Sequence, residues 1–341
     1  MREKQVRLSN IELLRILCMF GVLIVHADFG ALDIPTKQEL IDKTGVCVSR
    51  TFIESFSIVA VNTFVLLSGW FGIRFKWEAL AKLIFQCLFF TCTIYSLYLI
   101  GGGTVTIEGL KSCVMLTKNV WFVKCYIGLF ILSPVLNSFV EHSDRKIFKY
   151  AIICFFVYQS VFGWMFEAQD WIQNGYSTWS FIGLYLLARY VKIYRPKLSC
   201  LKKEYDITIY AVLSTLTALC MLLFVYTNKF TYFILFMHYT SPLIIIAALY
   251  LLLFFSKINI ISKHINWIAA SCFAVYMQHF MIFPLIMNPL IKNIVENNSA
   301  FLSSIFISLL LIVFFVVAIV TDKIRILVWN NIMNYFIKRN D

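Results

Sequence analysis

Two ionisable side chains on one apolar segment are the first candidates for chemistry. Arg15 and His26 stand eleven positions apart in a run that is otherwise mostly aliphatic. In a helix this spacing is close to three turns, so both side chains lie on one side, roughly 16–17 Å apart along the axis. An imidazole can accept a proton from a hydroxyl, and a guanidinium can hold an anion. The structural alternative is an arginine that extends to a polar interface and a histidine satisfied in the core.

A second cluster of candidates surrounds residue 70. Ser68 and Gly69 are small enough to let a ligand or another backbone approach closely, and Arg74 and Lys76 follow them. Basic side chains at such a position suit the binding of phosphate. The alternative is helix packing through small residues, next to an ordinary positively charged loop.

Other polar side chains occur in apolar runs far along the chain. Tyr276 and His279 belong to a late segment at a depth similar to that of His26, and His238 is a third imidazole. Three imidazoles can hold a metal, but nothing in the sequence fixes their mutual geometry, so we expect no metal site. Glu54 is suited to accept hydrogen bonds from a hydroxylated substrate, or else from neighbouring Ser and Tyr side chains.

The composition requires membrane helices to position these residues. Hydrophobic residues make up 60% of the 341 residues and charged residues only 14%, against roughly 25% charged in soluble domains. The mean hydropathy is +0.80. Several apolar runs reach the roughly 20 residues that a helix needs to cross a bilayer. The net charge of +12 is then explained by basic cytoplasmic loops, and not by binding to nucleic acid.

The apolar runs predict an all-α integral membrane protein with about ten transmembrane helices and both termini in the cytoplasm. In this arrangement the cytoplasmic segments carry 20 Lys and Arg residues and the outer loops carry seven, as the positive-inside rule requires. We expect a single membrane domain over residues 1–341, with a helical core at about 10–320 and a cytoplasmic tail at 321–341. The predicted helices are 10–28, 51–72, 77–100, 119–140, 147–166, 176–194, 206–226, 231–255, 264–290 and 299–320.

The candidate residues together resemble the signature of the acyltransferase-3 family of membrane O-acyltransferases. The resemblance covers about residues 10–320 and rests on four motifs. The first two are Arg15-x10-His26, preceded by Asn10 and Glu12, and the segment from Val61 to Trp70. The other two are Asn119-Val-Trp121-Phe122, running on to Ser133-Pro134, and Tyr276-Met-Gln-His279. Such proteins are described as moving an acyl group, commonly acetyl from cytoplasmic acetyl-CoA, to a hydroxyl of an extracytoplasmic saccharide. One motif departs from the family pattern, because members often carry Arg-x-x-Arg where this chain has Arg74-Phe-Lys76.

The resemblance implies a role for each candidate. His26 would be the catalytic histidine and Arg15 its motif partner, with Tyr276 or His279 orienting His26 or stabilising the oxyanion. Donor phosphates would lie against Arg15, Ser68, Arg74 and Lys76, and the acceptor against Glu54, Asn62 and Trp121. No permanently bound cofactor is implied, since acetyl-CoA or another acyl-CoA is a substrate. The expected partners are the lipid bilayer, acyl-CoA and a saccharide acceptor, in a bacterial inner membrane.

A multi-span transporter, flippase or polymerase of surface glycans is the alternative function. Transporters also place charges within the membrane, but residues 10–166 and 176–320 show no convincing repeat of one another. A polymerase is expected to have a large outer loop, whereas the longest predicted one, about 29–50, is short. The sequence therefore favours the acyltransferase.

Overall fold

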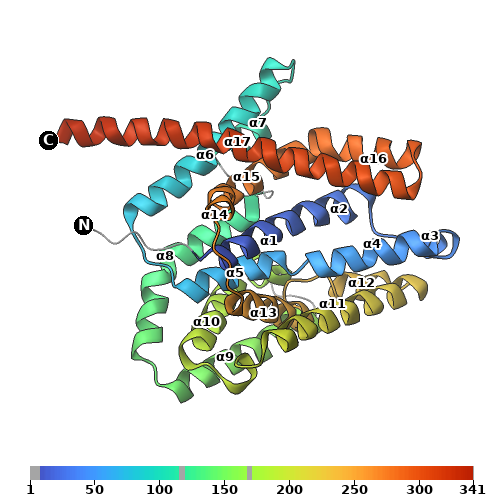
Figure 1. Ribbon diagram of the computed structural model, residues 1–341, viewed down its shortest axis with the longest axis horizontal. Coiled ribbons are helices and arrows are strands. Elements are labelled where there is room, and N and C mark those ends of the chain that lie inside the picture. The colour runs from blue at the N-terminus through green and yellow to red at the C-terminus, as the bar shows by residue number, and fades with distance from the viewer. Residues whose placement is uncertain (1–7, 115–119, 167–170, 341) are drawn as a thin grey trace.

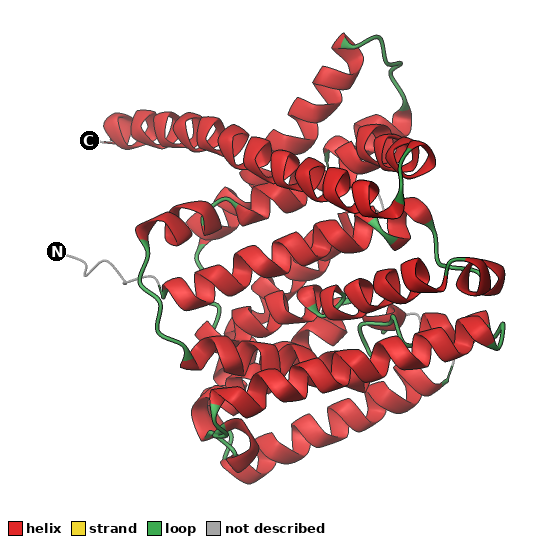
Figure 2. Cartoon of the chain, turned by 45° about the vertical axis from the view of Figure 1, so that its right-hand side comes forward, coloured by secondary structure: helices red, strands yellow, loops and turns green. Residues whose placement is uncertain are grey.

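The protein is a bundle of helices that run mostly side by side (Figure 1). The computed structural model describes residues 8–114, 120–166 and 171–340, with side chains up to residue 333, and within these ranges it contains helices and no strand (Figure 2). The α-helices are α1 (Ser9–Ala27), α2 (Phe29–Leu32), α3 (Lys37–Asp42), α4 (Thr44–Ser57), α5 (Ala60–Phe71), α6 (Trp77–Ile100), α7 (Ile107–Cys113), α8 (Trp121–His142), α9 (Arg145–Ser160), α10 (Thr178–Tyr194), α11 (Lys203–Tyr226), α12 (Phe230–Leu235), α13 (Pro242–Lys257), α14 (Lys263–Ala269), α15 (Cys272–Ile282), α16 (Asn288–Asn297) and α17 (Ala300–Asn340). Two π-helical turns, η2 (Val161–Met165) and η5 (Phe283–Met287), and two 3-10 turns, η3 (Gln173–Gly175) and η4 (Lys197–Ser199), complete the described elements.

The helices confirm the prediction of an all-helical, multi-pass membrane protein. Within the described residues, eight helical segments are long and apolar enough to cross a membrane, and α13 is a shorter apolar helix of 16 residues. The helix predicted at 176–194 is α10, which has 17 residues. The predicted orientation, with both termini in the cytoplasm, stays a prediction. The eight segments are Ser9–Leu32, Thr44–Phe71, Trp77–Ile100, Trp121–His142, Arg145–Met165, Lys203–Tyr226, Cys272–Asn297 and Ala300–Met333.

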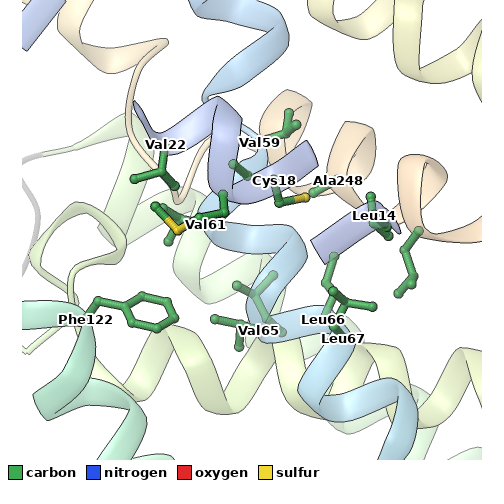
Figure 3. Packing of buried hydrophobic residues seen from close by; sticks show 14 of the residues in the cluster. Leu14, Cys18, Val22, Val59, Val61, Val65, Leu66, Leu67, Phe122 and Ala248 are labelled. Atoms are coloured by element: carbon green, nitrogen blue, oxygen red, sulfur yellow. The ribbon is translucent and has the colours of Figure 1, made fainter. Parts of the chain in front are cut away.

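Helix α1 lies at the centre of the bundle and positions the first candidate pair. It packs against α4, α5, α13, α14, α15 and α17. Its apolar face meets α5 in one cluster, in which Val22 lies near Val61, and Leu14 lies near Leu66 and Leu67 (Figure 3). The start of α1 and the end of α17 lie at one end of the bundle, and α2, α3 and α16 lie at the other (Figure 1).

Three of the predicted helices are divided in the structure, and two of these lie in the second half of the chain. The range 231–255 is divided into α12 and α13, and residues 236–241 between them are not helical. Pro242 begins α13, where its missing N–H costs no hydrogen bond. The side-chain amide of Asn62 donates to the carbonyl of Tyr239 at 2.9 Å and so supplies a partner for the unwound backbone. The range 264–290 is divided into α14, α15, the π-turn η5 and the start of α16.

Two other elements have different limits from those predicted. The helix predicted at 51–72 begins at Thr44 and is interrupted at residues 58–59, between α4 and α5. The last helix, predicted at 299–320, continues to Asn340. At 1.5 Å per residue its 41 residues extend about 60 Å, twice the thickness of a hydrocarbon core.

The closest approach of two helices that concerns the site is between α5 and α10. A side chain at Gly69 would collide with the carbonyl oxygen of Tyr185 and would lie 2.9 Å from the Cβ of Ala188. Only glycine lets the backbone of α5 come this close to α10. Helix α5 ends at Gly72, whose φ of +76° closes the helix in a conformation that glycine favours.

Candidate active site

Two cavities follow one another along α1. The Arg15 cavity has a volume of about 550 Å³ and is lined from α1, α5, α6, α8 and α15. The His26 cavity has a volume of about 470 Å³ and is lined from α1, α5, α8, α15 and the segments between α4 and α5 and between α12 and α13. Val22, Val61 and Tyr276 line both cavities. These three side chains therefore form a wall between the two cavities.

The His26 cavity brings two of the predicted imidazoles together. The rings of His26 and His279 lie 4.8 Å apart between centroids, although α1 and α15 are far apart in sequence. His279 is buried, whereas His26 is exposed because its side chain lines the cavity. Phe283 stands edge-on to both rings, at 6.3 Å from His26 and 5.9 Å from His279. The two imidazoles are thus surrounded largely by apolar side chains, and His26 can be reached from the cavity.

The backbone of α15 selects one tautomer of His279. Its Nδ1 lies 2.5 Å from the carbonyl oxygen of Tyr276, one turn earlier. A carbonyl oxygen can only accept, so this hydrogen bond requires the proton on Nδ1 and leaves Nε2 as an acceptor. The ring of Tyr276 lies 5.0 Å from that of His279. His279 is therefore suited to orient a neighbouring group through Nε2.

Aromatic side chains form one side of the His26 cavity. The ring of Trp121 lies 4.4 Å from Tyr176 and 5.8 Å from Tyr239, and the two tyrosine rings are 5.0 Å apart. The sequence analysis identified Trp121 but missed both tyrosines, which lie outside the long helices and follow no helical period. His238 also lines the cavity, and its buried Nδ1 has no hydrogen-bond partner among the described residues.

The Arg15 cavity is basic. Arg15, Arg74 and Lys82 line it, and among the residues that the structure describes its lining includes no Asp or Glu. Arg15 donates to Glu12 at 2.6 Å, so part of its charge is already neutralised. Lys82 was not predicted as a site residue, because a lone lysine within a helix gives no motif. The excess of positive charge suits a ligand with several negative charges.

The small residues predicted beside this cavity are also placed there. Ser68 lines the Arg15 cavity, and its hydroxyl donates to the carbonyl of Phe64 at 3.2 Å. A second neighbour is the hydroxyl of Tyr126, at 3.4 Å. Tyr126 is a further lining residue that sequence reasoning missed.

Three predicted site residues do not line either cavity. Lys76 precedes α6 and is exposed, and Asn62 is buried with its amide on the backbone of Tyr239. Glu54 is fully buried, and neither of its carboxylate oxygens has a hydrogen-bond partner among the described residues. Ser57, one turn after Glu54 on α4, does line the His26 cavity. Asn119 of the quoted motif lies outside the described residues.

The arrangement separates two chemical tasks. One cavity offers basic side chains for an anion, and the other offers two imidazoles and hydroxylated aromatic side chains. Proton transfer at a hydroxyl needs an imidazole of the second kind, and a phosphorylated carrier needs guanidinium or ammonium groups of the first kind.

Comparison with known proteins identifies the family of the chain. No curated protein and no solved structure matches the chain. The family model described as an acyltransferase domain, of the acyltransferase-3 type, matches residues 8–321. This match contains α1 to α16, most of the membrane-spanning part of α17 and all the residues that line the two cavities. The chain therefore belongs to the acyltransferase-3 family of membrane acyltransferases.

Proposed function

We propose that the protein transfers an acyl group, acetyl in the first instance, from acyl-CoA in the cytoplasm to a hydroxyl of an extracytoplasmic or lipid-linked saccharide. The observation that carries the proposal is the pair of cavities that share Val22, Val61 and Tyr276. The donor enters the basic Arg15 cavity and the acceptor enters the His26 cavity. The two reactants meet where the cavities adjoin, and the side chains of Val22, Val61 and Tyr276 must move apart there for the thioester to reach the hydroxyl.

His26 acts as the general base. Its imidazole accepts the proton of the acceptor hydroxyl while the hydroxyl oxygen forms a bond to the thioester carbonyl carbon. The carbon–sulfur bond of the tetrahedral intermediate then breaks, and the proton passes from His26 to the departing thiolate. The products are an O-acyl ester and free CoA, and His26 returns to its neutral form.

His279 and Tyr276 support this step from α15. Nε2 of His279 is an acceptor, so it can hold an N–H of His26 and direct the other ring nitrogen of His26 towards the acceptor. The hydroxyl of Tyr276, in the wall, is a donor for the oxyanion. An oxyanion-hole donor of this kind typically contributes about 10²–10³ in rate.

The phosphates of the donor lie in the Arg15 cavity. Arg74 and Arg15 hold them, Ser68 stands beside them, and Lys76 contributes charge from the end of the bundle. The pantetheine arm is comparable in length to the separation of Arg15 and His26 along α1, roughly 16–17 Å. The thioester therefore reaches the wall while the nucleotide stays at the cavity mouth.

The saccharide lies on the aromatic side of the His26 cavity. The face of Trp121 contacts the sugar ring, and Asn62 fixes the backbone that presents Tyr239. Glu54 is fully buried and does not line the cavity, so it does not contact the acceptor directly. Ser57, one turn later on α4, lines the cavity instead and offers its hydroxyl there.

The test measures the O-acyl content of surface glycans. Cells with the wild-type chain, the deletion, His26→Ala and His264→Ala are compared at matched membrane expression. His264 is the control, because it is exposed on α14 and lies outside both cavities. We expect the deletion to remove a specific O-acyl signal and His26→Ala to restore none of it, since a general base contributes about 10²–10⁴ in rate.

Full restoration by His26→Ala would show that His26 is not the base. One observation favours a transporter or flippase as the second candidate, namely the interrupted helices beside the His26 cavity, a feature of transporters. If glycan export changes and acylation is identical in all strains, the second candidate replaces the first.

A further inference from the structure

A guanidinium outside the predicted motifs lies against the end of α5. A Cβ at Gly72 would be 3.1 Å from Nη1 of Arg189 and 3.4 Å from its Cζ. Gly72 itself lines the Arg15 cavity. Arg189, near the end of α10, is not itself a lining residue, but its guanidinium lies beside Gly72, next to the turn that leads to Arg74.

Hydrogen bonds fix this turn to α10 and α8. The N–H of Ile73 donates to the hydroxyl of Tyr185 at 3.1 Å, and that hydroxyl donates to Oδ1 of Asn137 at 2.6 Å. The side-chain amide of Asn137 in turn donates to the carbonyl of Ile73 at 2.7 Å. Tyr185 and Arg189 are one helical turn apart on α10, so the bonds that hold the turn also fix its position relative to Arg189.

The charge of Arg189 has no counter-ion in the described part of the protein. Its Nε is buried without a hydrogen-bond partner, and none of the ion pairs among the described residues includes it. The lining of the adjacent cavity adds Arg74 and Lys82 and, over residues 8–114, 120–166 and 171–340, no acidic residue. A buried, unpaired guanidinium N–H is costly unless an anion completes it.

We infer that Arg189 is a phosphate-binding residue at the edge of the Arg15 cavity and that it holds a phosphate of the acyl donor. A guanidinium matches phosphate with two parallel N–H···O bonds, which an ammonium cannot form. The inference rests on the proposed function for the identity of the donor. It adds a residue from α10, a helix in which no residue had been assigned a role.

The test is equilibrium binding of CoA and of pantetheine to the purified full-length protein in phosphatidylcholine nanodiscs. Pantetheine lacks every phosphate, so it reports binding of the arm alone. We expect Arg189→Ala to weaken CoA binding on the order of 10- to 100-fold, the range for a lost hydrogen bond to a charged group, and to leave pantetheine binding unchanged. Arg189→Lys keeps the positive charge but cannot form two parallel hydrogen bonds to phosphate, so it should recover part of the affinity for CoA. Lys197→Ala, at an exposed position just after α10, is the matched control and should bind CoA like the wild type.

Wild-type affinity for CoA in Arg189→Ala would overturn the inference. Arg189→Gln, a neutral polar substitution that keeps the aliphatic part of the side chain, serves the same test if the alanine variant does not give a monodisperse protein. A second result would also overturn it. If an anionic lipid co-purifies with the wild type from phosphatidylglycerol nanodiscs but not with Arg189→Ala, and both proteins bind CoA with equal affinity, then the phosphate that Arg189 binds is that of a lipid headgroup. If the wild type itself fails to bind CoA, the donor of the proposed function is wrong and the inference falls with it. If only the inference about Arg189 is wrong, the wild type still binds CoA and still transfers the acyl group.

Discussion

Substituting Gly69 by alanine tests whether the close contact of α5 and α10 holds the Arg15 cavity in shape. The new Cβ would overlap the carbonyl oxygen of Tyr185 and lie 2.9 Å from both the Cα of Tyr185 and the Cβ of Ala188. These atoms belong to the backbone or adjoin it, so rotation of a side chain cannot relieve the overlap. The helices must separate, and overpacking of this kind costs about 1–3 kcal/mol.

Gly45→Ala is the matched control. Gly45 is in α4, and an added Cβ would meet no atom within 4 Å. Alanine is favoured over glycine in a helix by up to about 1 kcal/mol. The two substitutions make the same chemical change, and we expect opposite effects on stability. The measurement is the Tm of the purified protein in one detergent, with the KM for the acyl donor as the functional readout.

We expect Gly69→Ala to lower Tm and raise the donor KM, and Gly45→Ala to leave Tm equal or slightly higher with KM unchanged. Ser68 and Gly72 stand on either side of Gly69 in the cavity lining, so a shift of α5 moves both. A Tm for Gly69→Ala that equals that of Gly45→Ala would refute the reasoning, because the contact would then have room for a methyl group.

Three further substitutions have expected outcomes. Tyr185→Phe leaves the N–H of Ile73 without its acceptor, which costs about 1–3 kcal/mol, and should raise the donor KM more than it lowers kcat. Asp322→Asn disrupts a pair with Arg325 in which both side chains are buried and 2.6 Å apart. This change should destabilise the fold by about 3–5 kcal/mol by thermal unfolding, whereas replacing both residues by leucine should cost far less. Trp121→Ala should raise the KM for the saccharide several-fold in acyl-transfer assays and leave the donor KM unchanged, and an effect on the donor alone would count against its place in the acceptor site.

The fold class follows from the sequence because the bilayer restricts the choices. Apolar runs of about 20 residues must be helical so that each backbone group finds a partner, and composition shows them directly. The interruptions are harder to predict, because residues 58–59 lie within an apolar run and the polar residues 238–241 before Pro242 are too few to separate two long apolar runs by composition. Only a neighbour such as Asn62, which contacts the backbone of Tyr239, explains why the chain can unwind there. That neighbour lies 177 positions away.

The candidate site could be predicted in part, because the bilayer makes the apolar runs helical and a helix has a fixed spacing. Helical spacing places Arg15 and His26 on one side of α1, and both line a cavity there. Spacing cannot show that α15 brings His279 to within 4.8 Å of His26, since that depends on how the helices pack. Tyr239 and Arg189 gave no signal because one lies in an unwound segment and the other near a helix end rich in basic residues.

The wall of Val22, Val61 and Tyr276 also bears on the electrical resistance of the membrane. Two cavities joined without it would form a wet passage, and each ion that crossed would dissipate part of the membrane voltage. That voltage is worth about 2.3 kcal/mol per elementary charge for each 100 mV. Two branched aliphatic side chains and one aromatic ring offer an ion a single polar group, the hydroxyl of Tyr276, in place of its shell of water, so the wall opposes the passage of ions.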